Sequence, residues 1–584
     1  MTSDKHWRRW FLLFWLAASI YLIRDKWAAI HWFALSDTDD NLRFAQVRDL
    51  LAGQGWYDLR QHRIDPPAGI SVHWSRLVDL PIAGLMLILR PIVGVLEADR
   101  WACAIAPLLA FGAGLYGTML AARRLVAPWA FLLAGAILLC APTSMIMWSP
   151  LRIDHHGWQL ASLILAVCGM ADPKPIRGGL TAGIATAASL TIGLELLPYL
   201  AVTGALVTLW WVLDRDQGPR LRAYGLTLAG GAALGYLLFQ PYDNAQALCD
   251  ALTPVYVSSL LFAGALLVAI SAIRIENPWA RLAAAIAVGA ATAAMFAIAW
   301  PQCLGRPEHI TPELDRLWFS HIREAKPLYS HGWRIWFPTI AIPVVGVVGA
   351  ALTFWSERRG SRAIPWALVA LLSLFSMLLL LWQTRAGPAS QMMGVIGATA
   401  LGWRLIRTTL ASKWMLVRVV GSVAVFVFVS GLFAGIIVKK IPANRTTYRQ
   451  RVDLANRRCP TLPALSAIER LPAQTILTFT DLGPRIVATT HHSAIAGPYH
   501  RNGAAILDVQ KAFRATDPAF VHDVMRRHGA TLLLICPDLS ESTVYASEAP
   551  KGFYVQLVKN QIPAWLAPVP LPKNSPFKAW RLIG

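Results

Sequence analysis

Apolar runs of about 18 or more residues recur along this chain from residue 10 to residue 438, and they constrain the fold more than any other feature. A run of this length can cross the hydrocarbon core of a bilayer as a helix. Because 55% of the residues are hydrophobic and only 15% are charged, a soluble enzyme is excluded. The sequence predicts a polytopic α-helical membrane protein.

The spacing of the apolar runs predicts about thirteen transmembrane helices. The run 80–96 carries Pro81, Arg90 and Pro91 in its body, which would be costly in a helix that faces lipid. We therefore expect an interfacial or re-entrant element there. We place the transmembrane helices at about 10–30, 100–121, 127–147, 157–171, 178–194, 196–213, 222–240, 253–273, 279–300, 334–354, 364–383, 390–407 and 417–438.

Basic residues between the predicted spans fall on the side of the N-terminus. This pattern obeys the positive-inside rule and places the N-terminus in the cytoplasm, in our interpretation of a bacterial inner membrane. The formal charge of +21 is therefore interpreted as a topology signal and not as a sign of a nucleic-acid partner. The first run lacks a small-residue cleavage site, which favours a retained anchor. The clusters are Arg123 and Arg124, Lys174 and Arg177, Arg215 to Arg222, Arg274 and Arg281, 356–362, and Arg404 to Arg418.

The opposite, periplasmic face receives the outer loop 31–99, the outer loop 301–333 and everything after residue 439. Residues 439–584 predict a soluble α/β domain, because "QTILTF", "RIVATT", "TLLLIC" and "FYVQLV" are short β-rich runs and "RNGAAILDVQKAF" and "DPAFVHDVMRRHG" have helical spacing. The chain thus divides into a transmembrane domain, 1–438, and a periplasmic domain, 439–584. Four cysteines on this face allow two disulfides in an oxidising compartment: Cys249, Cys303, Cys459 and Cys536.

Charged side chains from separate segments gather on the same predicted face. Carboxylates that converge from several loops can bind Mg²⁺ or Mn²⁺ against a phosphate, and a nearby arginine adds bidentate phosphate recognition. Each residue also has a plainer interpretation: an aspartate beyond a helix end can be a cap, "DHH" can be a polar turn, and Glu324 can pair with Arg323 or Lys326. Their occurrence on one face favours a site, which contains Asp37, Asp39, Asp40, Asp154, His155, His156, Glu324 and Arg385.

The order of these segments resembles the GT-C membrane glycosyltransferases, most closely the catalytic subunits of oligosaccharyltransferases. In that family an acidic motif in the first outer loop is followed after nine residues by an Arg-Asp pair, as Asp39 is followed here by Arg48 and Asp49. The family's second acidic motif resembles "DHH" at Asp154. Its loop glutamate resembles Glu324 in "REAKP", and its later intramembrane arginine resembles Arg385.

The resemblance implies a glycosyltransferase that moves a sugar or glycan from a polyprenyl phosphate or diphosphate to a lipid, polysaccharide or protein acceptor at the periplasmic face of the lipid bilayer. Asp39 would bind the acceptor or act as general base. Asp39, Asp154 and Glu324 would ligate Mg²⁺ or Mn²⁺, although some GT-C enzymes with monophosphate donors use no metal. Arg385 and His155 would bind the donor phosphate, and Asp37, His73 and Trp74 would contact the acceptor or sugar.

One departure from the family concerns the acceptor. Oligosaccharyltransferases carry a Trp-Trp-Asp-Tyr-Gly motif that helps to recognise the sequon, whereas the corresponding stretch here keeps Asp481 and Gly483 but has no tryptophan. The resemblance does not extend to sequon recognition. A transporter or flippase for a lipid-linked glycan is the alternative function, since intramembrane charges also form ion pathways, and a non-catalytic scaffold is a third.

Overall fold

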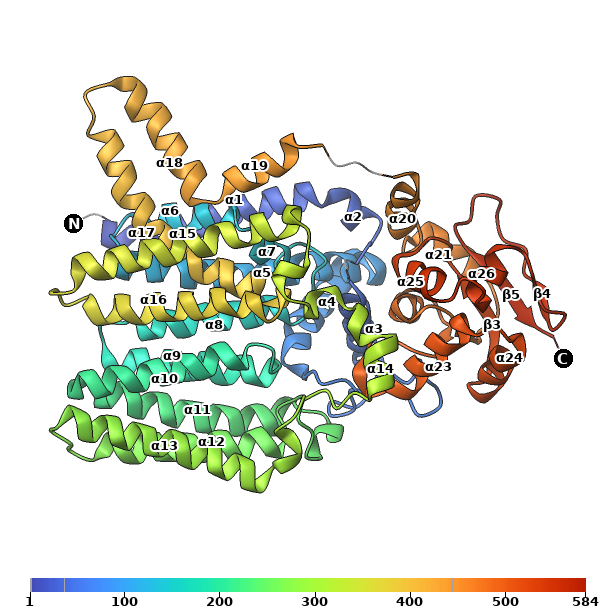
Figure 1. Ribbon diagram of the computed structural model, residues 1–584, viewed down its shortest axis with the longest axis horizontal. Helices are drawn as coiled ribbons and strands as arrows, with labels where there is room; N and C mark the ends of the chain where they lie inside the picture. The colour runs from blue at the N-terminus through green and yellow to red at the C-terminus, as the bar shows by residue number, and fades with distance from the viewer. Residues whose placement is uncertain (1–2, 36, 443–445, 584) are drawn as a thin grey trace.

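Long helices lie side by side in a bundle, and a smaller unit that contains a β-sheet lies at one end of it (Figure 1). The computed structural model describes residues 3–35, 37–442 and 446–583. The helices of the bundle and of its connecting segments are α1 Ser3–Asp25, α2 Trp27–His31, α3 Thr38–Leu51, α4 Asp79–Val93, α5 Val95–Leu125, α6 Ala130–Leu139, α7 Pro142–Ile146, α8 His156–Met170, α9 Pro175–Ile192, α10 Leu197–Leu213, α11 Gly218–Phe239, α12 Pro254–Ala272, α13 Pro278–Ala299, α14 Pro312–Leu317, α15 Trp333–Glu357, α16 Ala363–Leu378, α17 Gly387–Leu410, α18 Ser422–Val429 and α19 Leu432–Lys440.

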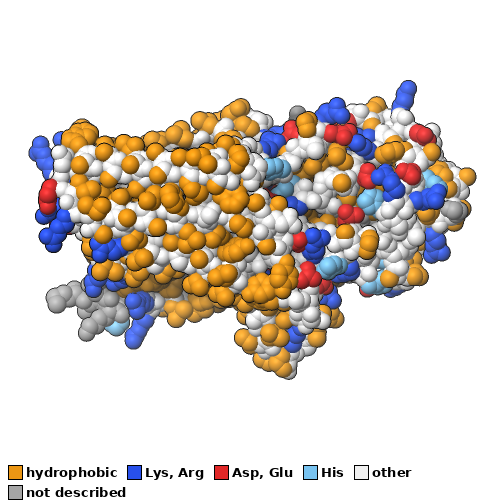
Figure 2. Space-filling view, turned by 90° about the horizontal axis from the view of Figure 1, so that it is seen from below, with side chains coloured by type: hydrophobic (Ala, Val, Ile, Leu, Met, Phe, Trp, Pro, Cys, Tyr) orange, Lys and Arg blue, Asp and Glu red, His pale blue; other side chains and the backbone are white. Residues whose placement is uncertain are grey.

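Each of the thirteen ranges predicted as spans contains helix. Five helices are long and apolar enough on their own to cross a membrane, namely α5, α12, α13, α15 and α16 with the turn that follows it, and a bent pair, Val417–Val429 with Leu432–Lys440, would make a sixth. Hydrophobic side chains cover the flank of the bundle, and lysines and arginines gather at the end away from the sheet unit (Figure 2). The protein is therefore a helical membrane protein, and the number and direction of its crossings stay predictions.

Two apolar segments depart from simple straight spans. The segment predicted as the span 417–438 is bent by 86° between Val417–Val429 and Leu432–Lys440, and whether it crosses the membrane stays a prediction. Gly431 adopts a φ of 70° at the bend, and the side chain of Ile342 lies 2.8 Å from the place of a β-carbon there, so the turn needs glycine. The other segment is α4, a helix of 15 residues that ends at Gly94, also at positive φ, and packs against α5.

The sheet unit has five strands in the order β2-β1-β3-β5-β4. The first strand of the chain, β1, runs parallel to β2 and β3, whereas β5 runs antiparallel to β3 and β4. The strands are β1 Thr475–Leu477, β2 Ser493–Ala494, β3 Ala530–Ile535, β4 Leu566–Pro568 and β5 Lys578–Leu582. The helices of this unit are α20 Thr447–Arg458, α21 Leu462–Glu469, α22 Gly483–Thr489, α23 Gly503–Arg514, α24 Pro518–Arg527, α25 Ser540–Glu548 and α26 Phe553–Val558.

Sequence patterns predicted some of these elements correctly. The strands in "QTILTF" and "TLLLIC" and the two predicted helices are confirmed as β1, β3, α23 and α24. The strands predicted in "RIVATT" and "FYVQLV" are wrong, because these runs form α22 and α26. A proline lies in the first turn of α22, which favours a helix start. In α26 the buried side chains are Phe553, Tyr554 and Leu557, a spacing that places them on one helical face.

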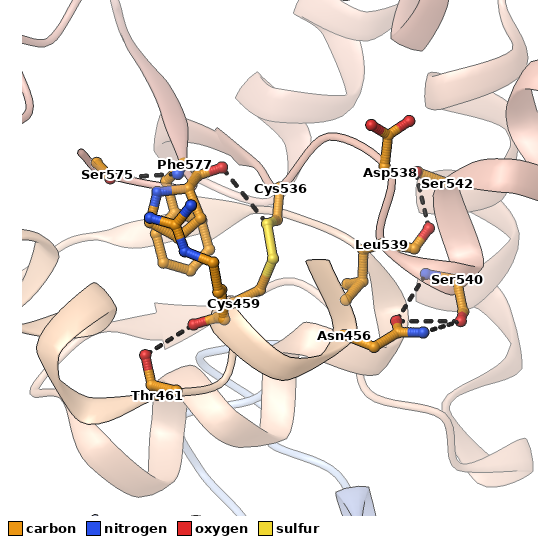
Figure 3. Close-up of a disulfide and its surroundings, with 12 residues drawn as sticks. Asn456, Cys459, Thr461, Cys536, Asp538, Leu539, Ser540, Ser542, Ser575 and Phe577 are labelled. Carbon is orange, nitrogen blue, oxygen red and sulfur yellow. Dashed lines mark hydrogen bonds between the residues drawn. A yellow bond between two sulfur atoms is a disulfide. The ribbon is translucent and has the colours of Figure 1, made fainter. Parts of the chain in front are cut away.

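Two disulfides join the four cysteines predicted to lie on the periplasmic face. Cys249 pairs with Cys303, and Cys459 pairs with Cys536. The second bond links the end of α20 to the residue after β3, and close by the side chain of Asn456 bonds with Ser540 (Figure 3). It therefore fixes α20, the first helix after the bundle, on the sheet.

The helix α3 is held from two sides. On the side of the bundle, buried Arg43 and Arg76 both pair with buried Asp79 at the start of α4, at 2.5 and 3.1 Å. From the sheet unit, Arg485 of α22 donates to the side-chain oxygen of Asn41 at 3.0 Å and to the carbonyl of Phe33 at 2.9 Å. A buried charge is stable only with such partners, so α3 has a fixed position between the bundle and the sheet unit.

Candidate active site

The start of α3 carries the acidic residues of the first outer loop. Asp37 is the N-cap, and its carboxylate accepts a hydrogen bond from the amide of Thr38 at 2.6 Å. Asp39 and Asp40 lie in the first turn. Carboxylates are favoured at a helix N-terminus because unpaired amides and the helix dipole present positive charge there.

Arg152 joins the acidic turn to the segment that precedes α8. Its guanidinium lies 2.6 Å from a carboxylate oxygen of Asp37 and 2.7 Å from one of Asp154. The carboxylate of Asp40 accepts a hydrogen bond from the backbone amide of Asp154 at 3.0 Å. Asp37 and Arg152 are 115 residues apart in sequence, so their ion pair brings the two acidic motifs into contact.

Asp39 differs from its neighbours because its carboxylate has no hydrogen bond or ion pair with another described residue. Burial, followed by the negative charges of Asp37 and Asp154, raises the pKa of Asp39 to about 7. A carboxylate that is unpaired and half-ionised near neutral pH is suited to accept a proton.

The two histidines after Asp154 face different partners. His156 lies 3.1 Å from the Asp154 carboxylate, and although burial opposes the charged form, this carboxylate raises the pKa of His156 to about 9. His155 stacks on His156 with ring centroids 4.3 Å apart, but its Nε2 lies 2.9 Å from Glu195. Burial lowers the pKa of His155 to about 4. The pair thus contains one imidazole that is charged at neutral pH and one that is not.

A cavity of about 330 Å³ lies beside these residues. One part of its wall is apolar and the other carries charge. Glu324 and Arg385 reach it from separate turns and form an ion pair at 2.6 Å. The Nε atoms of Arg152 and Arg385 are shielded from solvent and have no hydrogen-bond partner among the described residues. The charged lining residues are Arg152, His156, Glu195, Glu324 and Arg385, and the apolar ones include Ile146, Met147, Leu160, Leu196, Leu379 and Trp382.

Asp39 is electrostatically coupled to the charged part of this cavity. Burial alone would lower the pKa of Arg385, but nearby carboxylates, Glu324 first among them and Asp39 included, raise it. Asp39 itself does not belong to the cavity lining. Asp39 therefore interacts electrostatically with Asp154 on one side and with Arg385, the partner of Glu324, on the other.

Five other predicted residues lie outside the cavity lining, namely Asp37 and Asp154, described above, and His73, Trp74 and His155. Trp74 is 1% exposed, and Arg43 lies over its ring at 4.6 Å, so this side chain is part of the core under the site and has no free face for a sugar. His73 lies 3.3 Å from Glu195, and His155 contacts the same carboxylate. Both histidines therefore face Glu195 and not the cavity, while His156 lines it.

Sequence reasoning gave little weight to His156, Arg152 and Glu195. Glu195 is the one carboxylate in the turn between α9 and α10, and it accepts a hydrogen bond from Gln159 at 2.6 Å besides its two histidine contacts. Burial by itself raises a carboxyl pKa, but His155 and His73 hold the pKa of Glu195 well below its usual value. A charged residue in the short turn between two apolar runs is the signal in the sequence that could single it out.

The predicted metal ligands do not form a ligand set in this arrangement. The carboxylate of Asp154 is paired with Arg152 and His156, and that of Glu324 is paired with Arg385. Among the described residues, two groups have ligand atoms within 4.8 Å of one another, His73 with His155 and Glu195, and His73 with Asp250 and His500, and neither contains Asp39, Asp154 or Glu324. The donors of the predicted set therefore do not fit a bound Mg²⁺ or Mn²⁺ here.

Comparisons with known proteins identify the fold. No family model matches the sequence, and no curated protein matches it significantly. The structure is similar to that of the archaeal oligosaccharyltransferase AglB from Archaeoglobus fulgidus, which was solved in complex with an inhibitory peptide and a dolichol-phosphate. The TM-score is 0.67, and the match covers 96% of this chain and 73% of that chain at 13% sequence identity. The chain has the oligosaccharyltransferase fold.

A second structure of this oligosaccharyltransferase supports the same conclusion. The crystal structure of the A. fulgidus enzyme tethered to an acceptor peptide with the NVT sequon gives a TM-score of 0.64 over 94% of this chain and 72% of that chain, again at 13% identity. The resemblance to GT-C proteins that the short motifs indicated is therefore confirmed in the fold. At this identity the likeness concerns the fold alone, and the chemistry must be argued from the side chains.

Proposed function

We propose that this protein is a GT-C glycosyltransferase that moves a sugar or glycan from a polyprenyl phosphate or diphosphate to a hydroxyl acceptor on the periplasmic face of a bacterial inner membrane. One observation carries the proposal: the cavity of about 330 Å³ joins an apolar wall to Arg152, His156 and Arg385. A lipid phosphate has the same two parts, an apolar chain and an anionic head. The similar AglB structure holds a dolichol-phosphate, which is a lipid of this class.

The charged end of the cavity is suited to the departing phosphate. The unpartnered Nε of Arg385 can donate to a phosphate oxygen, and guanidinium groups recognise phosphate through a planar fork of donors. His156 is protonated at neutral pH because its pKa is about 9, so it adds a second positive charge. These groups would stabilise the negative charge that grows on the phosphate as the bond between the sugar and the phosphate breaks.

Asp39 would act as general base toward the acceptor. Its free carboxylate would take the proton of the acceptor hydroxyl while that oxygen bonds to the anomeric carbon of the sugar, and the phosphate would leave with the bonding electrons. The acceptor would approach from the sheet unit, which contacts this turn directly: the hydroxyl of Tyr499 donates to the carbonyl of Thr38, the residue before Asp39, at 3.1 Å. No metal ion enters these steps, because two of the three predicted carboxylates, those of Asp154 and Glu324, are paired with arginine and histidine.

The pH dependence of transfer follows from these groups. We expect the rate to rise with pH through about 7, where Asp39 loses its proton, and to fall through about 9, where His156 loses its charge. The substitution Asp37→Asn removes a negative charge that raises the pKa of Asp39, so it will move the lower limb to a lower pH. Initial rates from pH 5 to pH 10 would measure both limbs. A lower limb that stays in place in Asp37→Asn would contradict the role of Asp39.

Membranes that contain this chain test the function directly. A radiolabelled sugar on a polyprenyl phosphate carrier, and in parallel on a diphosphate carrier, would be incubated with the membranes, and lipid, polysaccharide and protein fractions would be analysed for label. We expect covalent label in one fraction and none in membranes with Asp39→Asn. Transport of the carrier across the bilayer without covalent transfer would instead support the flippase alternative.

A further inference from the structure

We propose that Gln159 and Thr143 recognise the sugar of the donor through hydrogen bonds to its hydroxyl groups. The inference rests on the proposed transfer from a polyprenyl phosphate or diphosphate, and it adds two residues that decide which sugar is accepted. Both side chains line the cavity of about 330 Å³. Each has a polar atom that is shielded from solvent and has no hydrogen-bond partner among the described residues.

Gln159 holds a hydrogen-bond acceptor in a fixed orientation. Its side chain is 1% exposed, and its Nε2 donates to a carboxylate oxygen of Glu195 at 2.6 Å. Because an ionised carboxylate only accepts hydrogen bonds, the end of the amide that faces Glu195 is the nitrogen. The other end, Oε1, is the atom without a partner. This oxygen can only accept, so a ligand must offer it an O–H or N–H group.

The carboxylate that orients Gln159 is itself held on both sides. Its Oε1 lies 2.9 Å from Nε2 of His155 and 3.3 Å from Nε2 of His73, while its Oε2 accepts from Gln159. Gly193 packs closely on this group, since an added β-carbon there would collide with Oε2 of Glu195. The amide of Gln159 is therefore oriented before a ligand arrives, which lowers the entropy cost of binding.

Thr143 reaches the cavity from a different helix. It lies in the first turn of α7, and its backbone amide donates to Oε1 of Gln391 at 2.9 Å. The amide nitrogen of Gln391 donates in turn to the carbonyl of Pro338 at 3.1 Å. These bonds fix the backbone of Thr143, whereas its hydroxyl has no partner among the described residues. A threonine hydroxyl both donates and accepts, so it can bond to a sugar hydroxyl in either sense.

Gln159 lies close to the group proposed to bind the phosphate. It follows His156 by three residues in α8, so the two side chains lie on the same face of the helix, and both line the cavity. The first sugar of a donor is bonded directly to the phosphate. A phosphate at His156 would therefore place this sugar within reach of neighbouring polar groups of the wall.

A cavity that held only a lipid chain would favour apolar side chains at both positions. Burial of a polar atom without a partner is destabilising, and much of the remaining wall is apolar, with Ile146, Leu160 and Leu379 among its residues. Water can bond to these atoms in the free protein, and a sugar hydroxyl makes the same bonds when it displaces the water. The two polar atoms thus suit a ligand that carries hydroxyl groups beside its phosphate.

Competitive binding to the purified full-length protein in detergent tests this inference without an acceptor. The probe is radiolabelled polyprenyl methyl phosphate, which has the charge of the donor but no sugar, and in parallel the corresponding diphosphate. The competitors are the same lipid phosphates that carry glucose, galactose, mannose or N-acetylglucosamine. We expect at least one of them to bind the unmodified protein about tenfold more tightly than the methyl compound, as two or more hydrogen bonds would give.

Gln159→Leu and Thr143→Val will each lower this advantage about fivefold, the loss expected for one hydrogen bond, and will leave the affinity for the methyl compound unchanged. Thr143→Ser keeps the hydroxyl and will keep the advantage. Gln450→Leu makes the same chemical change as Gln159→Leu at an exposed position of α20 and will behave as the unmodified protein.

Equal affinity of the unmodified protein for the methyl compound and for every sugar-bearing lipid would overturn the inference. An advantage that survives in both Gln159→Leu and Thr143→Val would also overturn it. An equal loss of affinity for the methyl compound would show that the two residues only maintain the shape of the cavity, which is a third contrary result. Failure of the unmodified protein to bind any of these lipid phosphates would instead count against the proposed function itself.

Discussion

Replacing Asp39 with asparagine will lower the rate of sugar transfer by about 10²–10⁴-fold, the usual contribution of a general base, while the protein stays folded in the membrane. The amide is close to the carboxylate in size but cannot take a proton at neutral pH. Asp39 has no hydrogen bond or ion pair with another described side chain, so the substitution breaks no contact that holds α3 in place.

The measurement is the initial rate of label transfer at saturating donor, compared with Asp58→Asn. Asp58 lies in the same outer loop and bonds with His62 and the amide of Arg60, so this control makes the same chemical change away from the site. We expect its rate to match that of the unmodified protein. Full activity in Asp39→Asn would show that another group accepts the proton and would remove the central residue of the proposed mechanism.

Replacing Arg385 with alanine will lower kcat/KM for the lipid-linked donor by about 10²–10³-fold, the size of effect expected when a donor to a developing charge is removed. Arg385 lines the cavity, and its shielded Nε has no partner among the described residues. Arg385→Lys will recover only part of the activity, because an ammonium group restores the charge without the planar fork of donors.

The ion pair with Glu324 needs a control of its own, since the alanine variant also leaves this carboxylate without its arginine. The double variant Arg385→Ala with Glu324→Gln separates the two effects. We expect it to stay as slow as Arg385→Ala. Recovery of activity in the double variant would show that the unpaired carboxylate caused the loss and that Arg385 does not act on the phosphate. Arg323→Ala, a matched change in the same turn as Glu324, should leave kcat/KM unaffected.

Sequence alone predicted the helical ranges well, because apolar runs and their polar breaks depend on local composition. Of the predicted site residues, Glu324 and Arg385 line the cavity, and the shared role of Asp39, Asp154, Glu324 and Arg385 stays a prediction. Prediction from sequence failed where long-range contacts decide the outcome. The run "RIVATT" has strand composition, but its apolar side chains are buried against other elements as the helix α22.

The sequence also could not predict which charged groups form ion pairs with one another. The spacing of Asp154 and Glu324 does not say that one carboxylate pairs with Arg152 and the other with Arg385, and these pairs decide which oxygens remain free for a ligand. The same holds for Glu195, whose partners lie 36, 40 and 122 residues away in Gln159, His155 and His73. A pattern that spans such separations is visible only once the chain is folded.

Hydrogen bonds from Arg485 and Tyr499 join the C-terminal unit to the segment around α3 and limit how this unit can be exchanged. Arg485 bonds to Asn41 and Phe33, and the hydroxyl of Tyr499 donates to the carbonyl of Thr38 at 3.1 Å, one residue before Asp39. The C-terminal unit is thus bonded to the turn that carries Asp39 and is not a separable accessory. A chimera that exchanged this unit for a foreign one would lose these hydrogen bonds and disturb the position of Asp39, so the unit would vary more readily through side-chain changes than through its replacement.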